Sequence, residues 1–311
     1  MKTKVYIDGQ EGTTGLKIVE RLEERSDITL LKIDSALRKD PQERQRLMNQ
    51  SEYTILCLPD VAAIEAVSLI ENEAVKVIDA STAHRTHEEW AYGFPELSSQ
   101  HRQKIQSSKR VAVPGCYASG FAALVYPLVT AGILPQDYPI VCHATSGYSG
   151  GGKQTIQAYE ATPRPIEYEA PRLYALEQQH KHLKEMQFVS NLDYAPIFNP
   201  IIADYYQGMT VAIPLHTRLL AKGLTVETLQ QFFMEHYANQ SFIKVSPTSP
   251  SGFLGANGVV DSNVLEIYLS GHEEQILLVA RLDNLGKGAS GAAVQCLNIM
   301  MGIDETTSLK E

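Results

Sequence analysis

The first third of the chain alternates short apolar runs with longer amphipathic stretches. This pattern predicts strands over 4–8, 28–33, 53–58 and 75–79, joined by helices over 16–22, 41–49 and 61–71. Strands that alternate with helices form a parallel sheet with right-handed crossovers and with helices on both faces. The first part of the chain is therefore predicted to have an α/β fold, a doubly wound parallel sheet of the Rossmann type.

The second half of the chain has apolar runs with fewer helices between them. It predicts strands over 141–146, 209–215, 242–245, 264–269 and 275–282, with one helix over 225–237. This arrangement favours a second, α+β domain around a mixed sheet. The segment from Asp283 predicts a turn and a long helix that packs back on the first domain. We therefore expect a dinucleotide-binding Rossmann domain of residues 1–115 plus 287–311 and a second domain of residues 116–286.

Three glycines, Gly9, Gly12 and Gly15, follow the first predicted strand and open the first helix. Glycines at this place let the backbone approach a pyrophosphate that rests on the helix N-terminus. Thr13 and Thr14 add hydroxyl donors. The alternative is a tight turn without a ligand, because a glycine pattern alone is a weak signal.

The residues after the second predicted strand bear on the choice of dinucleotide. Asp34 suits the ribose of NAD, whereas Ser35, Arg38 and Lys39 offer groups for the 2′-phosphate of NADP. The phosphate-binding set is larger, so the sequence favours NADP. A solvated loop is the alternative for the two basic residues.

Cys116 differs from the other three cysteines in its surroundings. Cys57, Cys142 and Cys296 lie in apolar runs, as buried thiols do, whereas Cys116 follows Pro114-Gly115 and opens an apolar stretch to 129. A helix that starts there places the thiol near free backbone N–H groups and the positive dipole end, which stabilise a thiolate. A nucleophile and a buried thiol both remain open from these residues alone.

Further candidates lie in three polar segments. Arg85 ends the loop 79–85, after the fourth strand, and can hold a carboxylate or phosphate bidentately. Residues 147–153 form a small-residue loop that can wrap a ligand or act as a connector. If residues 179–185 are helical, His182 and Glu185 lie on one face, where a carboxylate can orient an imidazole; a solvated helix face is the alternative. His180 and His182 without a supporting cluster do not predict a metal site.

Composition narrows the class of protein. The 311 residues are 44% hydrophobic and 20% charged, as in ordinary globular proteins, and the net charge of −9 argues against nucleic acid and anionic membrane as partners. No apolar run approaches the roughly 18 residues of a membrane span. Four cysteines without paired spacing and the lack of a signal-peptide pattern favour free thiols and a cytoplasmic location.

Seven segments along nearly the whole chain resemble the N-acetyl-γ-glutamyl-phosphate reductase family, and in particular its short (type 2) subfamily. The segments are 9–15, 79–85, 93–97, 113–117, 146–152, 180–185 and 283–302. This resemblance implies a semialdehyde dehydrogenase-like fold, whose second domain serves catalysis and oligomerisation. It also implies a homo-oligomer, a dimer or tetramer, formed through the sheet of the second domain.

The same resemblance implies a reaction and a set of residues. The reaction is the NADPH-dependent reductive dephosphorylation of N-acetyl-γ-glutamyl phosphate to the 5-semialdehyde in arginine biosynthesis, through a thioester on Cys116. The family's acid/base maps onto His180, with His182 and Glu185 as supports. Further candidates are Arg85, Ser149 and Gly150 for the acyl phosphate substrate and Asn284 for the nicotinamide end of NADP.

Three other functions stay open. An aspartate-semialdehyde dehydrogenase shares the fold and the chemistry, but its cysteine usually follows Asn, whereas Gly115-Cys116-Tyr117 is typical of the acetylglutamyl branch. A non-catalytic, dinucleotide-sensing Rossmann protein needs neither Cys116 nor His180. A cysteine hydrolase needs no dinucleotide, so the glycine turn argues against it.

Overall fold

The computed structural model describes residues 2–311, which form two compact units. The first unit comprises residues 2–115 and 289–309, and the second comprises residues 116–288 and 310–311. Residues 287–288 and 310–311 thus belong to the second unit, although the sequence places them in the first domain.

The first unit is built on a six-stranded sheet in the order β2-β1-β3-β4-β6-β5, in which every pair is parallel. The strands are β1 (Thr3–Asp8), β2 (Ile28–Leu31), β3 (Tyr53–Leu56), β4 (Lys76–Asp79), β5 (Ala91–Tyr92) and β6 (Arg110–Ala112). The helices are α1 (Thr13–Leu22), α2 (Pro41–Gln50), α3 (Asp60–Ser68), α4 (Ser99–Ser107) and α9 (Gly291–Met301). The predicted doubly wound α/β fold is confirmed.

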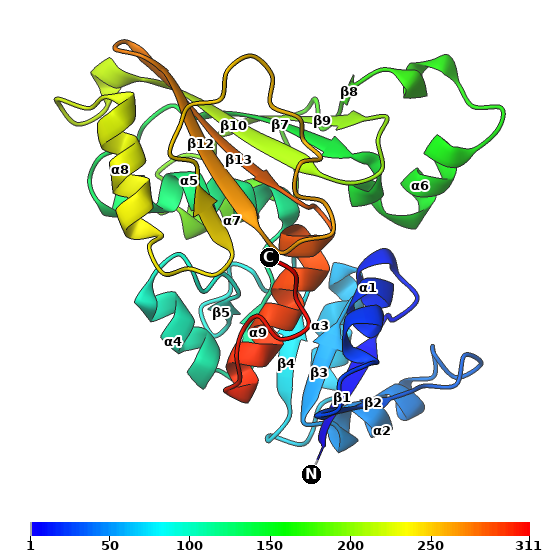
Figure 1. The fold of residues 1–311 in the computed structure, drawn as a ribbon. Coiled ribbons are helices and arrows are strands. Elements are labelled where there is room, and N and C mark those ends of the chain that lie inside the picture. The colour runs from blue at the N-terminus through cyan, green and yellow to red at the C-terminus, as the bar shows by residue number, and fades with distance from the viewer. Residues whose placement is uncertain (1) are drawn as a thin grey trace. The chain divides into compact units, whose positions relative to one another are not determined.

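Side chains that alternate along β1 enter two different cores. Val5 and Ile7 pack in a buried cluster with residues of α1, α4 and α9, whereas Tyr6 packs with residues of α2 and α3. Helices therefore cover both faces of the sheet, as Figure 1 shows for this unit. This explains why the central strands read as nearly continuous apolar runs.

The second unit contains a mixed seven-stranded sheet in the order β11-β12-β13-β10-β7-β9-β8. The strands are β7 (Val141–Gly147), β8 (Arg172–Leu173), β9 (Ile197–Ala203), β10 (Met209–His216), β11 (Ile243–Val245), β12 (Leu265–His272) and β13 (Gln275–Leu282). The helices are α5 (Cys116–Thr130), α6 (Gly152–Glu160), α7 (Leu183–Val189) and α8 (Val226–His236), with short helical turns η1 (Tyr148–Gly151), η2 (Ile166–Glu169) and η3 (Thr217–Leu219). A further turn, η4 (Gly286–Ser290), begins in this unit, and its last two residues belong to the first. The α+β character is confirmed; α6, α7, β8 and β9 lie in segments that the sequence pattern did not assign.

Helix α5 packs closely on the centre of this sheet. A Cβ atom on Gly120 would lie 2.6 Å from Cγ2 of Val211, so only glycine allows this approach to β10. On β12 and β13, Glu266 and Arg281 are partly exposed and form a cross-strand ion pair of 2.6 Å. The sheet thus supports α5 at β10, and partly exposed polar side chains lie on β12 and β13.

Pro127 interrupts the hydrogen bonding inside α5. Proline has no N–H group, so the carbonyl of Ala123, one turn earlier, lacks its helical donor. The hydroxyl of Tyr237, just after α8, donates to this carbonyl at 2.7 Å. A side chain from another helix therefore satisfies the buried group that the proline leaves open.

We predict that Tyr237→Phe lowers the free energy of unfolding of the second unit by about 1–3 kcal/mol, because the buried carbonyl of Ala123 loses its donor. Urea denaturation followed by circular dichroism measures this change. Tyr194→Phe is the control: its side chain is 70% exposed, and we expect a change below about 0.5 kcal/mol. Equal stabilities of the Tyr237→Phe variant and the wild type would contradict the assignment.

Candidate active site

A pocket of about 400 Å³ lies in the first unit, at the carboxyl ends of its central strands. Gly9 and Gly12 line it. Gly9 has φ +83° and a Cβ atom there would lie 2.3 Å from the carbonyl oxygen of Cys57, so this turn requires glycine. A Cβ atom on Gly15 would lie 2.4 Å from the oxygen of Gly9, which shows how closely α1 approaches the turn.

The first turn of α1 holds the two predicted hydroxyl donors. Thr13 and Thr14 are the first two residues of α1, directly after Gly12, and Gly15 is buried. None of these three belongs to the pocket lining among the described residues. They form the helix N-terminus that faces this end of the sheet, where backbone N–H groups can receive a phosphate.

The loop after β2 contains both groups of residues that bear on the choice between NAD and NADP. Asp34 turns into its own loop, where its Oδ1 accepts the N–H of Ala36 at 2.9 Å. Ser35, Arg38 and Lys39 line the pocket, whereas Asp34 is not part of the lining. The groups that face the pocket are therefore those that suit a 2′-phosphate.

A buried ion pair also lines this pocket. Nε and Nη2 of Arg44 donate to Oδ2 of Asp8 at 3.0 and 2.9 Å, and both side chains are at least nine-tenths buried. Burial raises the pKa of the Asp8 carboxyl, and the bonds from Arg44 oppose this shift. The pair ties α2 to the end of β1. Sequence analysis missed it because the partners lie 36 residues apart.

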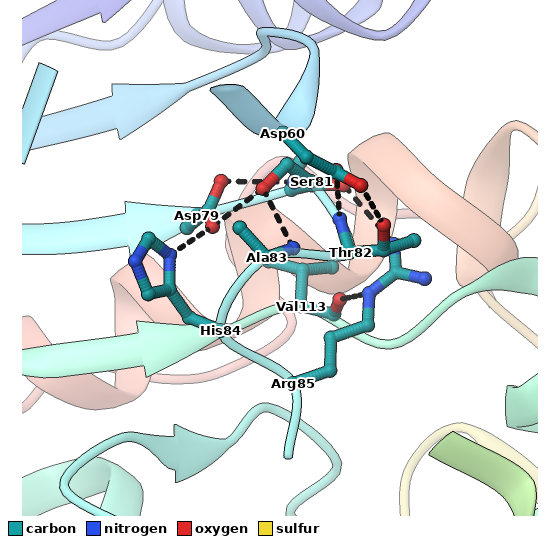
Figure 2. A network of polar contacts seen from close by, with 9 residues as sticks. Asp60, Asp79, Ser81, Thr82, Ala83, His84, Arg85 and Val113 are labelled. Atoms are coloured by element: carbon teal, nitrogen blue, oxygen red, sulfur yellow. Dashed lines mark hydrogen bonds and ion pairs between the residues drawn. The ribbon is translucent and has the colours of Figure 1, made fainter. Parts of the chain in front are cut away.

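The loop after β4 is held by a network of polar contacts (Figure 2). The buried carboxylate of Asp79 accepts from the hydroxyl of Ser81 at 2.7 Å and lies 2.6 Å from Nδ1 of His84, whose ring stacks on Trp90. In the same loop, the N–H of Thr82 donates to Asp60 at 2.9 Å. The loop is therefore fixed by contacts within itself and by Asp60 of α3.

Arg85 is buried beside this network. Its Nε donates to the carbonyl of Val113 at 2.8 Å and its Nη2 to that of Ala80 at 3.1 Å, as Figure 2 shows for Val113. Val113 lies three residues before Cys116. The guanidinium is thus bound to the chain segment that leads to the candidate thiol.

Cys116 is the first residue of α5, as the Pro114-Gly115 pair predicts. The segment η4 passes beside it: a Cβ atom on Gly288 would lie 2.8 Å from Cβ and 3.3 Å from Cα of Cys116. Gly288 is therefore the residue that leaves room for Cys116. Sequence analysis did not select Gly288, because the two residues are far apart in the chain and meet only in the fold.

The other three thiols differ from Cys116 in their surroundings. Cys142 and Cys296 are fully buried, and Sγ of Cys296 donates to the carbonyl of Gly93 at 3.4 Å. Cys57 packs against the core of the first unit, and burial raises its pKa to about 12. These three have the packing of structural thiols.

His180 lies among aromatic rings near the start of α5. Its ring centroid is 5.8 Å from those of Tyr117 and Tyr174 and 5.1 Å from that of Phe198. The hydroxyl of Tyr174 donates to that of Tyr117 at 2.9 Å. Because Tyr117 directly follows Cys116, this aromatic group connects the candidate base to the candidate nucleophile.

The protonation state of His180 follows from two observations. Its Nδ1 accepts the backbone N–H of His182 at 3.1 Å, which leaves the proton of the neutral ring on Nε2. Burial, together with the charge of Lys181, lowers the pKa of His180 to about 4. Near neutral pH the ring is therefore an uncharged Nε2–H donor.

The predicted supports occupy the beginning of α7. This helix starts at Leu183 rather than earlier, so His182 is the residue before it and Glu185 lies in its first turn. Both side chains are buried. The ring of His182 lies 4.7 Å from that of His180.

The structure brings Ser149, Gly150 and Asn284 together. Nδ2 of Asn284 donates to Oγ of the buried Ser149 at 2.9 Å, and its Oδ1 accepts the N–H of Gly208 at 2.8 Å. A Cβ atom on Gly150 would lie 3.4 Å from the same Nδ2. The amide of Asn284 thus fixes the start of η1.

Known proteins and protein families match nearly the whole chain. A semialdehyde dehydrogenase NAD-binding domain matches residues 4–105, and a semialdehyde dehydrogenase dimerisation domain matches residues 116–284. N-acetyl-γ-glutamyl-phosphate reductase 2 of a Nostoc species is 47% identical and the match covers 99% of both chains. N-acetyl-γ-glutamyl-phosphate reductase of Burkholderia ambifaria is 45% identical, and N-acetyl-γ-glutamyl-phosphate reductase 2 of Pseudomonas putida is 47% identical, each over 96% of both chains.

The chain belongs to the N-acetyl-γ-glutamyl-phosphate reductase family of semialdehyde dehydrogenases. The match to a dimerisation domain indicates that this family member forms a homo-oligomer. Aspartate semialdehyde dehydrogenase II of Vibrio cholerae has the same fold, with a TM-score of 0.73 and 16% identity over 97% of this chain and 99% of that one.

In residues 2–311 there is no helix with both the length and the apolar character needed to cross a membrane. Within the same residues, no three or more His, Cys, Asp or Glu side chains are grouped so as to hold a metal ion.

We predict that Gly288→Ala lowers the free energy of unfolding by about 1–3 kcal/mol, because the new methyl group would lie 2.8 Å from Cβ of Cys116 and must displace its neighbour. Urea denaturation followed by circular dichroism measures this change. Gly255→Ala is the control, since its Cβ atom would meet only the side-chain oxygen of Asn257, at 3.2 Å, and we expect a smaller change. Equal stabilities of the two variants would contradict the contact.

We predict that the NMR titration of the His180 ring has its midpoint near pH 4 rather than at the ordinary 6.5. Between these values the unfolded chain binds the extra proton, so the free energy of unfolding falls as the pH is lowered from about 6.5 to about 4. In the His180→Gln variant, the free energy of unfolding should therefore fall less between pH 7.5 and pH 5 than in the wild type. Urea denaturation at these two pH values measures the difference. A midpoint near 6.5 would contradict the buried, neutral ring.

Proposed function

We propose that this protein is an NADP-dependent N-acetyl-γ-glutamyl-phosphate reductase that forms N-acetylglutamate 5-semialdehyde and phosphate, a step of arginine biosynthesis. The observation that carries this proposal is Cys116 at the start of α5, in a chain whose full-length relatives bear that name. We also propose that the first unit binds the dinucleotide and that the second serves catalysis and oligomerisation.

Cys116 is the proposed nucleophile. As the first residue of α5 it lies at the helix end where backbone N–H groups stabilise a thiolate. The thiolate attacks the acyl carbon, a C–S bond forms, and the bond from that carbon to the phosphate oxygen breaks. The product is a thioester, with inorganic phosphate as the leaving group. The same N–H groups can stabilise the oxyanion of the tetrahedral intermediate.

The first unit has the groups that a bound NADP needs. Gly9, Gly12 and Gly15 with the hydroxyls of Thr13 and Thr14 are the proposed pyrophosphate contacts. Ser35 and Arg38 are the proposed contacts of the 2′-phosphate, because they line the pocket from which Asp34 is turned away. When bound, NADPH supplies the hydride that reduces the thioester carbon.

His180 is the proposed hydrogen-bond donor of the second half-reaction. Reduction of the thioester places negative charge on the former carbonyl oxygen, and the neutral ring donates a hydrogen bond from Nε2–H to it while keeping its proton. The C–S bond then breaks, the aldehyde leaves, and the thiolate of Cys116 returns. With its proton on Nε2, His180 is better suited to this donation than to the removal of a proton from Cys116.

The remaining residues are proposed to position these groups. The backbone N–H of His182 holds the His180 ring by Nδ1, and Glu185 supports this turn from α7. Ser149 and Gly150 are proposed substrate contacts, and Asn284, which bonds to Ser149, is proposed for the nicotinamide end. Arg85 remains a proposed substrate contact, while its bonds to Val113 and Ala80 tie it to the segment before Cys116.

We further propose that the protein acts in the cytoplasm as a dimer or tetramer joined through the seven-stranded sheet. The partly exposed residues on this sheet, such as Glu266 and Arg281, supply a polar surface for that contact. An aspartate-semialdehyde dehydrogenase activity is not favoured, because the solved structures of that name share only 14–17% identity with this chain.

We predict that the wild type reduces NADP⁺ when given N-acetylglutamate 5-semialdehyde and phosphate, and that Cys116→Ser lowers this rate by about 10³-fold or more, because the hydroxyl is a far weaker nucleophile. Absorbance of the reduced nucleotide measures the rate. Cys142→Ala, which changes a thiol buried in β7, is the control and should keep the activity. Aspartate semialdehyde in place of the acetylated substrate should give little reaction. A wild type that reduces no nucleotide would overturn the proposal.

A further inference from the structure

An acidic residue competes for the basic group that we assign to the 2′-phosphate. Glu11 lies within the glycine turn, and its Oε2 forms an ion pair with Nη1 of Arg38 from the loop after β2. Both side chains line the same pocket. Their charges therefore cancel each other at the place where an anionic ligand would need the arginine.

This ion pair is accessible and weakly held. The side chains of Arg38 and Glu11 are 49% and 51% exposed, and an exposed pair changes an equilibrium constant by only about fivefold or less. A phosphate accepts two parallel bonds from a guanidinium and carries more charge than a carboxylate. A phosphate that enters the pocket can therefore displace Glu11 from Arg38.

The other acid in the pocket has a different partner. Asp8 is buried and bound by two nitrogens of Arg44, and the pair is too enclosed to exchange with a ligand easily. Asp34 bonds within its own loop. Glu11 is thus the acid of the pocket lining that neutralises an exposed arginine.

We propose that Glu11 sets the strength of the preference for NADP over NAD. Glu11 holds Arg38 in the free enzyme, and the 2′-phosphate of NADP must displace Glu11 from Arg38. Glu11 therefore weakens the binding of NADP. NAD has no 2′-phosphate, so its binding is nearly unaffected. This inference rests on the proposed function, because it requires that the pocket binds the adenosine part of the dinucleotide.

The test compares Glu11→Gln with the wild type in the binding of NADPH and NADH, measured by calorimetry at low salt. We expect the Kd for NADPH to fall by about two- to fivefold, the size of one exposed charge interaction, and the Kd for NADH to change less than that for NADPH. High salt should shrink the gain for NADPH, because exposed charges are screened. An unchanged Kd for NADPH, or an equal change for both nucleotides, would overturn the proposal.

Two further variants sharpen the test. Glu23→Gln removes an exposed acid that is paired with Lys32 at 2.7 Å, outside the pocket lining, and should alter neither Kd. Arg38→Gln should weaken NADPH binding. Adding Glu11→Gln to it should then gain less than about twofold, because no arginine remains to be released. A full gain in the double variant would show that Glu11 acts by repulsion alone and would overturn the competition for Arg38.

The two proposals fail in different ways. A wild type that binds neither nucleotide contradicts the proposed function. A wild type that binds NADPH, with Kd values that Glu11→Gln does not change, contradicts only the role of Glu11.

Discussion

The tight packing of α5 is the constraint on which the candidate nucleophile depends. A thiol at the first turn of a helix is useful only if that helix cannot shift, and α5 is held along its whole length. Gly120 lets it approach β10, and Tyr237 satisfies the carbonyl that Pro127 leaves open. At the other end Gly288 leaves just enough room for Cys116. The position of Cys116 therefore depends on the packing of an apolar helix.

The polar side chains near the proposed sites are held in place by hydrogen bonds and ion pairs. At the proposed ligand sites, several of the chain's own polar groups are already bound within the fold. Asp8 holds Arg44, Asp79 holds Ser81 and His84, and the Arg85 guanidinium binds main-chain carbonyls. Such networks keep loops in place without a ligand, and buried groups in them remain satisfied. A ligand then meets preorganised backbone at the carboxyl ends of the strands.

Sequence analysis succeeded where a local pattern sets the structure. Periodicity and turn residues located the central strands of the first unit, and Pro114-Gly115 located the start of α5. Features that depend on contacts between distant parts of the chain were not predicted. Strands as short as β5 and β8 have no periodicity to detect, and neither the Asp8–Arg44 pair nor the contact of Gly288 with Cys116 has any local signature. The segment around His180 is a turn, because Nδ1 of His180 takes the N–H of His182 just before α7 begins.

That same hydrogen bond links the local structure to the chemistry. A histidine whose Nδ1 accepts a backbone N–H has one free ring position, and in the neutral ring this position carries a proton. Burial among Tyr117, Tyr174 and Phe198 keeps the ring neutral by lowering its pKa to about 4. An uncharged donor does not form an ion pair with a thiolate, so it leaves the nucleophilic form of Cys116 to the amide groups of α5. The two proposed roles, nucleophile and hydrogen-bond donor, are thus supplied by separate features of the second unit.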